Sequence, residues 1–136
     1  MSALLDTGFL LAVLDGDDEH HAACKASLLA ESKPLLPDVD IPELAYMVLR
    51  ELGYDVLVAF LNSLFAGELV VAQTKREDWA RAAQILAKYA DSRVDFVDCM
   101  IVAMAERLNI QRILTVDKRH FSLFRPSHHT HFEIVP

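Results

Sequence analysis

The segment from Val94 to Phe121 constrains the fold of this chain more than any other stretch. It reads VDFVDCMIVAMAERLNIQRILTVDKRHF, a helical apolar pattern followed by a short β-branched run. The run RILTV is short enough for a buried parallel strand, and Asp117 follows it directly. Asp95 and Asp98 lie three residues apart, so they share one face at the start of the helix. Because ligands bind at the carboxyl ends of strands in open α/β sheets, we expect these three acids near one place.

The rest of the chain alternates short apolar strands with helices. Strands are expected at residues 2–5, 33–37, 68–72, 112–116 and 132–135, with amphipathic helices between them. This order predicts an α/β protein, a three-layer α/β/α sandwich around a central, mostly parallel sheet of about five strands. The 136 residues, 53% of them hydrophobic, are enough for one buried core, so residues 1–136 are expected to form a single domain.

Two local expectations concern the helices. Either Asp38 or Asp40 is expected to cap the helix that has Pro42 in its first turn. A second, longer helix is expected over residues 75–89. Its core-facing residues are expected to be Trp79, Ala82, Ala83, Ile85 and Leu86.

Four acids occupy comparable places in this pattern. Asp6 and Asp117 each follow a strand, whereas Glu43 and Asp98 each lie in the first turn of a helix. Taken singly, each has an ordinary interpretation as a helix cap, a turn residue or a partner of the helix dipole. Together they predict one acidic rim, where a divalent cation such as Mg²⁺ or Mn²⁺ would relieve the repulsion between carboxylates. A cation held in this way activates water for phosphodiester hydrolysis.

Charge and cysteine content narrow the class of protein. The formal net charge of -7 disfavours non-specific binding to nucleic acid, which depends on neutralising phosphates. Cys24 and Cys99 are isolated in the sequence and are expected to be reduced, buried thiols in a cytoplasmic protein. The N-terminal apolar run is interrupted by Asp6 and lacks a basic start, so neither a signal peptide nor a membrane span is expected.

At this point the sequence resembles the PIN-domain nucleases, and within them the VapC-like toxins of bacterial toxin–antitoxin pairs. The resemblance covers essentially the whole chain. It rests on four short motifs that stand in the order and spacing of the family: LLDTGFLLAVLD at 4–15, PELAYMVLRELG at 42–53, VDFVDCMIVAMAERL at 94–108 and ILTVDKRHF at 113–121. The closing segment FRP…FEIVP, at residues 124–136, is also similar.

The resemblance implies roles for particular residues. Asp6, Glu43, Asp98 and Asp117 match the catalytic, metal-binding acids of the family, and Asp95 matches an additional acid that is either a metal ligand or a helix cap. Thr7 and Thr115 match polar positions near the site.

The same resemblance implies an activity and partners. The activity is that of a Mg²⁺-dependent endoribonuclease, with Mn²⁺ as the other candidate ion, which hydrolyses RNA phosphodiesters with a metal-activated water. The implied partners are an RNA substrate, a cognate antitoxin and a second copy of the chain in a homodimer.

Two further sets of residues have open interpretations. Lys118 and Arg119, in a run that ends at His120, are either contacts for RNA phosphates or ordinary surface charge. An apolar helix face is either core or a surface for dimer or antitoxin; it consists of Phe60, Leu61, Leu64 and Phe65.

Other functional classes fit less well. A phosphatase with Asp6 as nucleophile would need a second Asp where Gly8 stands, and a phospho-receiver would need a Lys on the late strand FEIV. A PIN-like binding or signalling module with an inactive site remains the alternative, and RNA cleavage is the test that separates it from the nuclease.

Overall fold

The computed structural model describes all residues from 1 to 136, and a five-stranded sheet runs through its middle. The strands are β1 (Ser2–Leu5), β2 (Lys33–Pro37), β3 (Val70–Ala72), β4 (Arg112–Leu114) and β5 (Glu133–Val135). Their order across the sheet is β3-β2-β1-β4-β5, and each neighbouring pair is parallel. The prediction of a mostly parallel sheet of about five strands is therefore confirmed.

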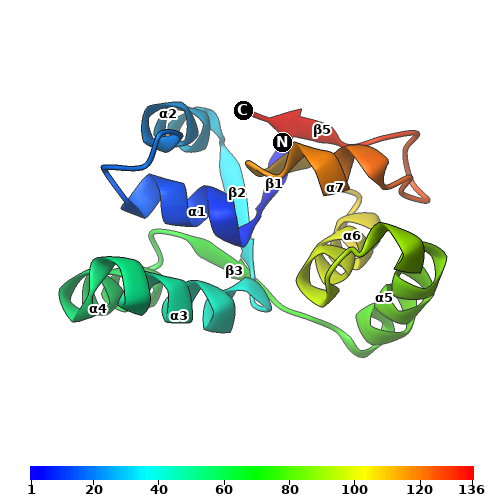
Figure 1. Ribbon diagram of the computed structural model, residues 1–136, viewed down its shortest axis with the longest axis horizontal. Coiled ribbons are helices and arrows are strands. Elements are labelled where there is room, and N and C mark those ends of the chain that lie inside the picture. The colour runs from blue at the N-terminus through cyan, green and yellow to red at the C-terminus, as the bar shows by residue number, and fades with distance from the viewer.

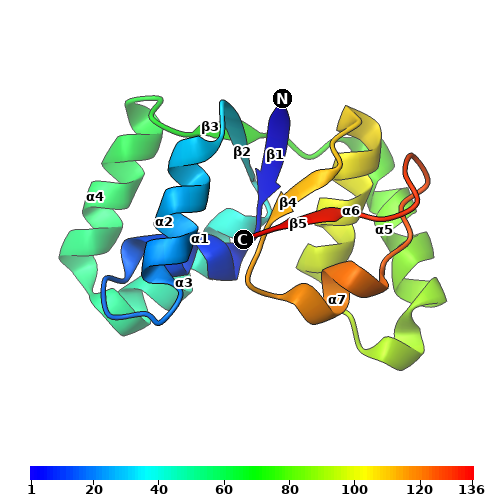
Figure 2. The same cartoon turned by 90° about the horizontal axis from the view of Figure 1, so that it is seen from above.

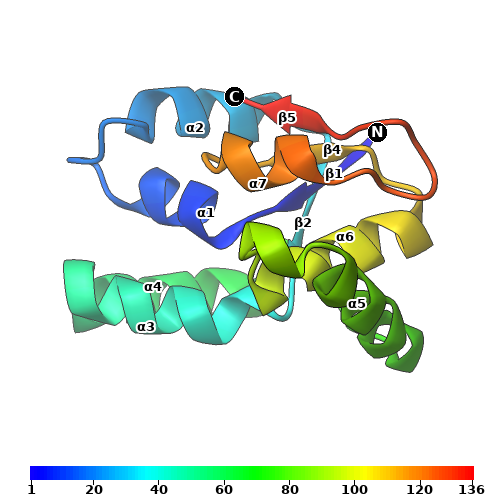
Figure 3. The same cartoon turned by 45° about the vertical axis from the view of Figure 1, so that its right-hand side comes forward.

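Helices cover both faces of this sheet (Figure 1). One side carries α1 (Thr7–Leu14), α2 (His21–Ala30), α3 (Asp40–Leu52) and α4 (Tyr54–Phe65). The other side carries α5 (Arg76–Lys88), α6 (Phe96–Leu108) and α7 (Lys118–Leu123), with a single 3₁₀ turn, η1 (Ala90–Ser92), between α5 and α6. Figure 2 shows the sheet between the two helical groups, which confirms the three-layer sandwich. Figure 3 shows α3 and α4 running side by side.

Alternation along the strands builds two cores. On β1, Ala3 and Leu5 face the layer of α1 to α4, whereas Leu4 faces the layer of α5 to α7. On β4, Ile113 and Leu114 divide between the two layers in the same way. Because every central strand is buried on both faces, its sequence is continuously apolar, and polar groups are confined to the strand ends.

The orientation of α5 corrects one expectation. Trp79 was expected in the core, but it is 54% exposed and stacks on Phe96, with ring centroids 5.8 Å apart. The buried stripe of α5 is instead Asp78, Ala82 and Ile85, spaced four and three residues apart. Asp78 pairs with Arg107 of α6 at 2.9 Å, and this ion pair turns the adjacent Trp79 outward. Ala83, also expected in the core, is exposed as well.

Both cysteines are buried and unpaired, as expected. None of the helices combines the length and the apolar character that crossing a bilayer requires.

Candidate metal centre

Asp6 is fixed at the carboxyl end of β1 by hydrogen bonds from both neighbouring segments. Its Oδ1 accepts from the backbone N–H of Thr7 at 2.9 Å, and its Oδ2 accepts from the Thr115 hydroxyl at 2.7 Å. Its own N–H donates to the carbonyl of Leu114 on β4 at 2.9 Å. The carboxylate is almost fully buried, so these contacts hold it in one orientation at the junction of β1 and β4.

Asp98 lies in the first turn of α6 and is only 4% exposed. Asp95 caps this helix, because its Oδ1 accepts from the backbone N–H of Asp98 at 2.8 Å. The two acids therefore meet at the amino end of α6, and the cap fixes where Asp98 points. The structure gives Asp95 the helix-cap interaction, one of its two expected roles, and leaves its carboxylate beside the cluster.

Asp117 and His120 reach Asp98 from α7. Asp117 caps this helix, accepting from the backbone N–H of His120 at 3.1 Å, and its own N–H donates to the Thr115 hydroxyl oxygen at 2.9 Å. The His120 Nδ1 lies 3.0 Å from Oδ2 of Asp117 and 3.2 Å from Oδ2 of Asp98. Asp98, Asp117 and His120 offer three ligand atoms within 4.8 Å of one another. In the sequence, His120 stands in a run of basic residues and was not expected at the site. Its spacing of three residues from Asp117, which puts both on one face of a helix, is the signal that could have indicated this position.

Glu43 lies at the solvent edge of the cluster. It occupies the first turn of α3, is exposed, and has no hydrogen-bond partner. Its charge nevertheless helps to raise the pKa of both Asp98 and Asp40, so it belongs to the same electrostatic group. The structure thus brings Asp6, Asp98 and Asp117 together behind a more exposed Glu43.

Asp40 is a buried acid whose place the sequence did not predict. It is the first residue of α3 but not its cap, and both of its oxygens are buried without a hydrogen-bond partner, as is the Thr7 hydroxyl. The other candidate cap, Asp38, instead accepts two hydrogen bonds from Thr74, at 2.9 and 2.5 Å. The expectation that one of these acids caps α3 is therefore wrong.

Comparison with known proteins identifies this arrangement. Residues 3–125 match the family described as PIN domain. The chain belongs to the PIN domain family. This confirms the identification drawn from the four sequence motifs.

Individual proteins similar to this PIN domain include a ribonuclease and a toxin. It is 34% identical over 135 residues to Ribonuclease VapC26 of Mycobacterium tuberculosis, an alignment that covers 98% of this chain and 99% of that protein. Its fold matches VapC20 of M. tuberculosis, a sarcin-ricin loop cleaving toxin, with a TM-score of 0.79 and 19% identity, over 86% of this chain and 91% of that one. It also matches the DNA-bound VapBC of Salmonella typhimurium, with a TM-score of 0.72 and 21% identity, over 98% of both chains.

The acids of the PIN domain are too crowded to ionise independently. Burial, followed by the charges of Asp6, Asp95, Asp117 and Glu43, raises the pKa of Asp98 to about 8. Burial also raises the pKa of Asp6 to about 6, although the hydrogen bonds from Thr115 and Thr7 oppose the rise. Burial, followed by the nearby charges of Asp6 and Glu43, raises the pKa of Asp40 well above its usual value.

These residues fit a divalent cation. Burial and repulsion between the carboxylates raise the pKa of Asp98 and Asp6, and both oxygens of the buried Asp40 lack a hydrogen-bond partner. A bound divalent cation would offset both costs. Carboxylate oxygens are the ligands that Mg²⁺ and Mn²⁺ take in proteins.

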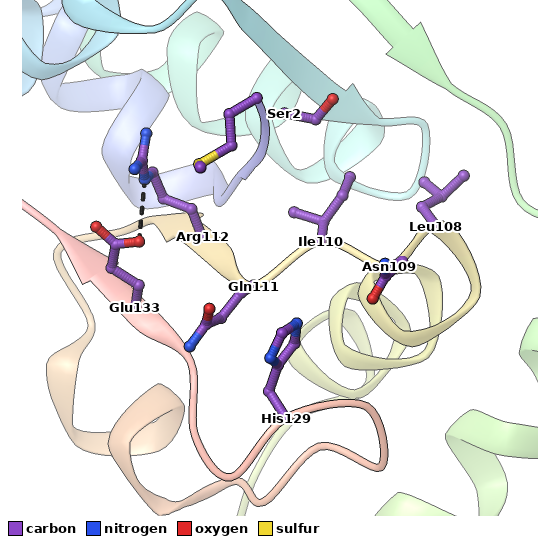
Figure 4. Close-up of a pocket in the computed structure, with 9 residues that line it drawn as sticks. Ser2, Leu108, Asn109, Ile110, Gln111, Arg112, His129 and Glu133 are labelled. Carbon is purple, nitrogen blue, oxygen red and sulfur yellow. Dashed lines mark ion pairs between the residues drawn. The ribbon is translucent and has the colours of Figure 1, made fainter.

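The three cavities of the PIN domain lie away from this cluster. One, of about 370 Å³, opens at the amino ends of β1, β4 and β5, where Arg112 and Glu133 form a 3.3 Å ion pair (Figure 4). The other two, of about 420 and 470 Å³, border α4. None of them is lined by Asp6, Asp98 or Asp117.

Proposed function

We propose that this PIN domain is a divalent-cation-dependent endoribonuclease and the toxin of a VapBC-type toxin–antitoxin pair. The observation that carries the proposal is the convergence of Asp6, Asp98 and Asp117 at the carboxyl ends of β1 and β4. The near-full-length similarity to a VapC ribonuclease supports RNA as the substrate, and similarity to toxin–antitoxin complexes supports an antitoxin.

Asp6, Asp98 and Asp117 would hold the cation, which we propose to be Mg²⁺ or Mn²⁺, with Glu43 and Asp95 at the edge of the site. A divalent cation bound there supplies Lewis-acid polarisation of water and of the RNA phosphodiester. The Thr115 hydroxyl and the Thr7 N–H hold the Asp6 carboxylate in place for this. We propose that Glu43, which is exposed and has no hydrogen-bond partner, accepts a proton from water during the reaction.

Lys118 and Arg119 are proposed to contact the RNA. Both are exposed, both directly follow Asp117, and neither forms an ion pair within the chain. Their charges are therefore free for phosphate oxygens beside the acidic rim. With a net charge of -7, the chain would bind RNA through such local contacts rather than through its overall charge.

The proposed protein partners would meet an apolar stripe on α4. Tyr54, Val58, Leu61 and Phe65 recur at helical spacing and are all exposed, Phe65 at 94%. Of the apolar face expected from the sequence, Phe60 is buried, so core packing accounts for only part of that face. We propose that the stripe receives an antitoxin segment, and that the protein is a cytoplasmic homodimer.

The test is to express the chain without antitoxin and sequence the 5′ ends of cellular RNA. The variants are Asp98→Asn and, as a control, Asp17→Asn, which removes a carboxylate from an exposed loop. We expect a few discrete cuts from the wild type and from Asp17→Asn, and none from a folded Asp98→Asn protein. Cuts that persist in Asp98→Asn would refute the proposed site. A folded wild type that makes no cuts would favour a binding or signalling module with an inactive site.

A further inference from the structure

His120 points into the acidic cluster rather than toward solvent. Its Nδ1 lies between Oδ2 of Asp98 and Oδ2 of Asp117, at 3.2 and 3.0 Å, whereas its Nε2 has no partner. The next residue, Phe121, is fully buried, and the Asp117 cap holds the first turn of α7. The imidazole is thus fixed from both sides, with one nitrogen directed at two proposed metal ligands.

The three side chains lie close enough together to share one cation. Nδ1 of His120 lies 3.2 Å from Oδ2 of Asp98 and 3.0 Å from Oδ2 of Asp117. Each of the three residues offers one ligand atom within 4.8 Å of the other two.

A simple ion pair does not account for the position of His120. The cluster contains six acids, namely Asp6, Asp40, Glu43, Asp95, Asp98 and Asp117, and one imidazolium would leave most of their charge unbalanced. Asp40 is fully buried with both oxygens unpartnered, and this independently supports a cation at the cluster. A divalent ion that takes Nδ1 as a ligand would neutralise charge on the acids and would also give the imidazole nitrogen a partner.

We propose that His120 is a nitrogen ligand of the metal centre, beside Asp98 and Asp117, and that it makes the site prefer Mn²⁺ to Mg²⁺. This inference rests on the proposed metal site. Mg²⁺ favours oxygen donors, whereas the divalent transition metals bind imidazole more readily, and Mn²⁺ accepts carboxylate and imidazole together. The histidine therefore shifts the selectivity of an otherwise all-oxygen site.

The test is pulsed electron paramagnetic resonance of Mn²⁺ bound to the purified, metal-free full chain. We expect ¹⁴N modulation from a bound imidazole, which is replaced by a ¹⁵N signal when histidine is isotopically labelled. The modulation should vanish in His120→Ala and His120→Gln, and remain in His20→Ala. His20 is a matched control, because it also lies beside a carboxylate, 3.3 Å from Glu19, but on the surface.

Titration of the same proteins with each ion gives a second readout. We expect His120→Ala to weaken Mn²⁺ binding about tenfold or more, with a much smaller effect on Mg²⁺. Bound Mn²⁺ without ¹⁴N modulation in the wild type, or modulation unchanged in His120→Gln, would overturn the role of His120 and leave the proposed nuclease intact. Failure of both ions to bind the wild type would overturn the metal site as well. The wild-type spectrum alone can exclude a histidine ligand, and the His120 variants together with His20→Ala assign the signal to one of the six histidines.

Discussion

The Thr115 hydroxyl donates a 2.7 Å hydrogen bond to Oδ2 of Asp6 and so joins two residues that are 109 positions apart in the chain. The same hydroxyl oxygen accepts from the N–H of Asp117 at 2.9 Å. One buried side chain therefore sets the orientation of one proposed metal ligand and the backbone position of another. Thr115 therefore acts as a positioning residue between β1 and β4.

Thr115→Val should destabilise the protein and weaken cation binding. Valine keeps the shape but removes the donor, so the buried Asp6 carboxylate loses one of its two hydrogen bonds. We expect a loss of about 1–3 kcal/mol in the free energy of unfolding. Thr115→Ser, which keeps the hydroxyl, should restore most of the cation affinity. Denaturant titrations and cation binding to both variants measure this; equal cation affinity in the valine and serine proteins would contradict it.

The metal-free protein should become less stable as the pH rises. The pKa of Asp6 is raised from 3.8 to about 6 and that of Asp98 from 3.8 to about 8, so the folded chain holds these protons more tightly than the unfolded chain. The contribution of these two groups to the free energy of unfolding is complete below pH 3.8, and it is lost as the pH rises through about 6 for Asp6 and about 8 for Asp98. The shift at Asp6 alone corresponds to about 3 kcal/mol.

Urea unfolding in chelator at pH 5 and pH 8 tests this dependence. Saturating Mg²⁺ or Mn²⁺ should recover stability at pH 8, because only the folded chain presents the assembled site. Asp98→Asn should flatten the pH profile. A metal-free wild type that gains stability between pH 5 and pH 8 would show that the acids are not held as described.

Asp40→Asn and Asp38→Asn should change stability in opposite directions, although the two positions are only two residues apart. Burial disfavours the charged form of Asp40 in the folded chain and raises its pKa, so Asn, which is neutral in both states, should raise the free energy of unfolding of the metal-free protein by about 1–3 kcal/mol at pH 7. Asp38 accepts two hydrogen bonds from Thr74, and its loss should lower that free energy by about 1–2 kcal/mol. Parallel denaturation curves measure both, and changes of the same sign would contradict the assignment.

Phe65→Glu should weaken antitoxin binding without affecting RNA cleavage. The ring is almost entirely exposed on α4, and a carboxylate there would have to be desolvated in an apolar interface. We expect the affinity for the co-expressed antitoxin to fall at least about tenfold. Lys25→Glu, an exposed change on α2, is the control. If Phe65→Glu instead converts a dimer into a monomer and leaves antitoxin binding unchanged, the stripe is the self-interface.

Local patterns were sufficient for most of the fold. The short apolar runs at β1 and β4 predicted strands, and the order of strands and helices predicted parallel pairing. They were insufficient where a partner from another element decides the direction of a side chain. Trp79 carries a large apolar ring and was expected inside, yet the pairing of Asp78 with Arg107 fixes the rotation of α5 and leaves Trp79 outside.

Sequence alone determined which acids stand at strand ends and helix starts, because backbone periodicity and the burial of apolar side chains are local properties that a single chain displays. Only the tertiary structure decided which of those acids meet. The β1–β4 pairing brings Asp6 to Thr115, and the packing of α7 aims His120 at Asp98. The burial of Asp40 without a partner likewise depends on elements distant in the chain. Distances and desolvation arise from contacts between such elements, and it is these that give the cluster its capacity for a cation.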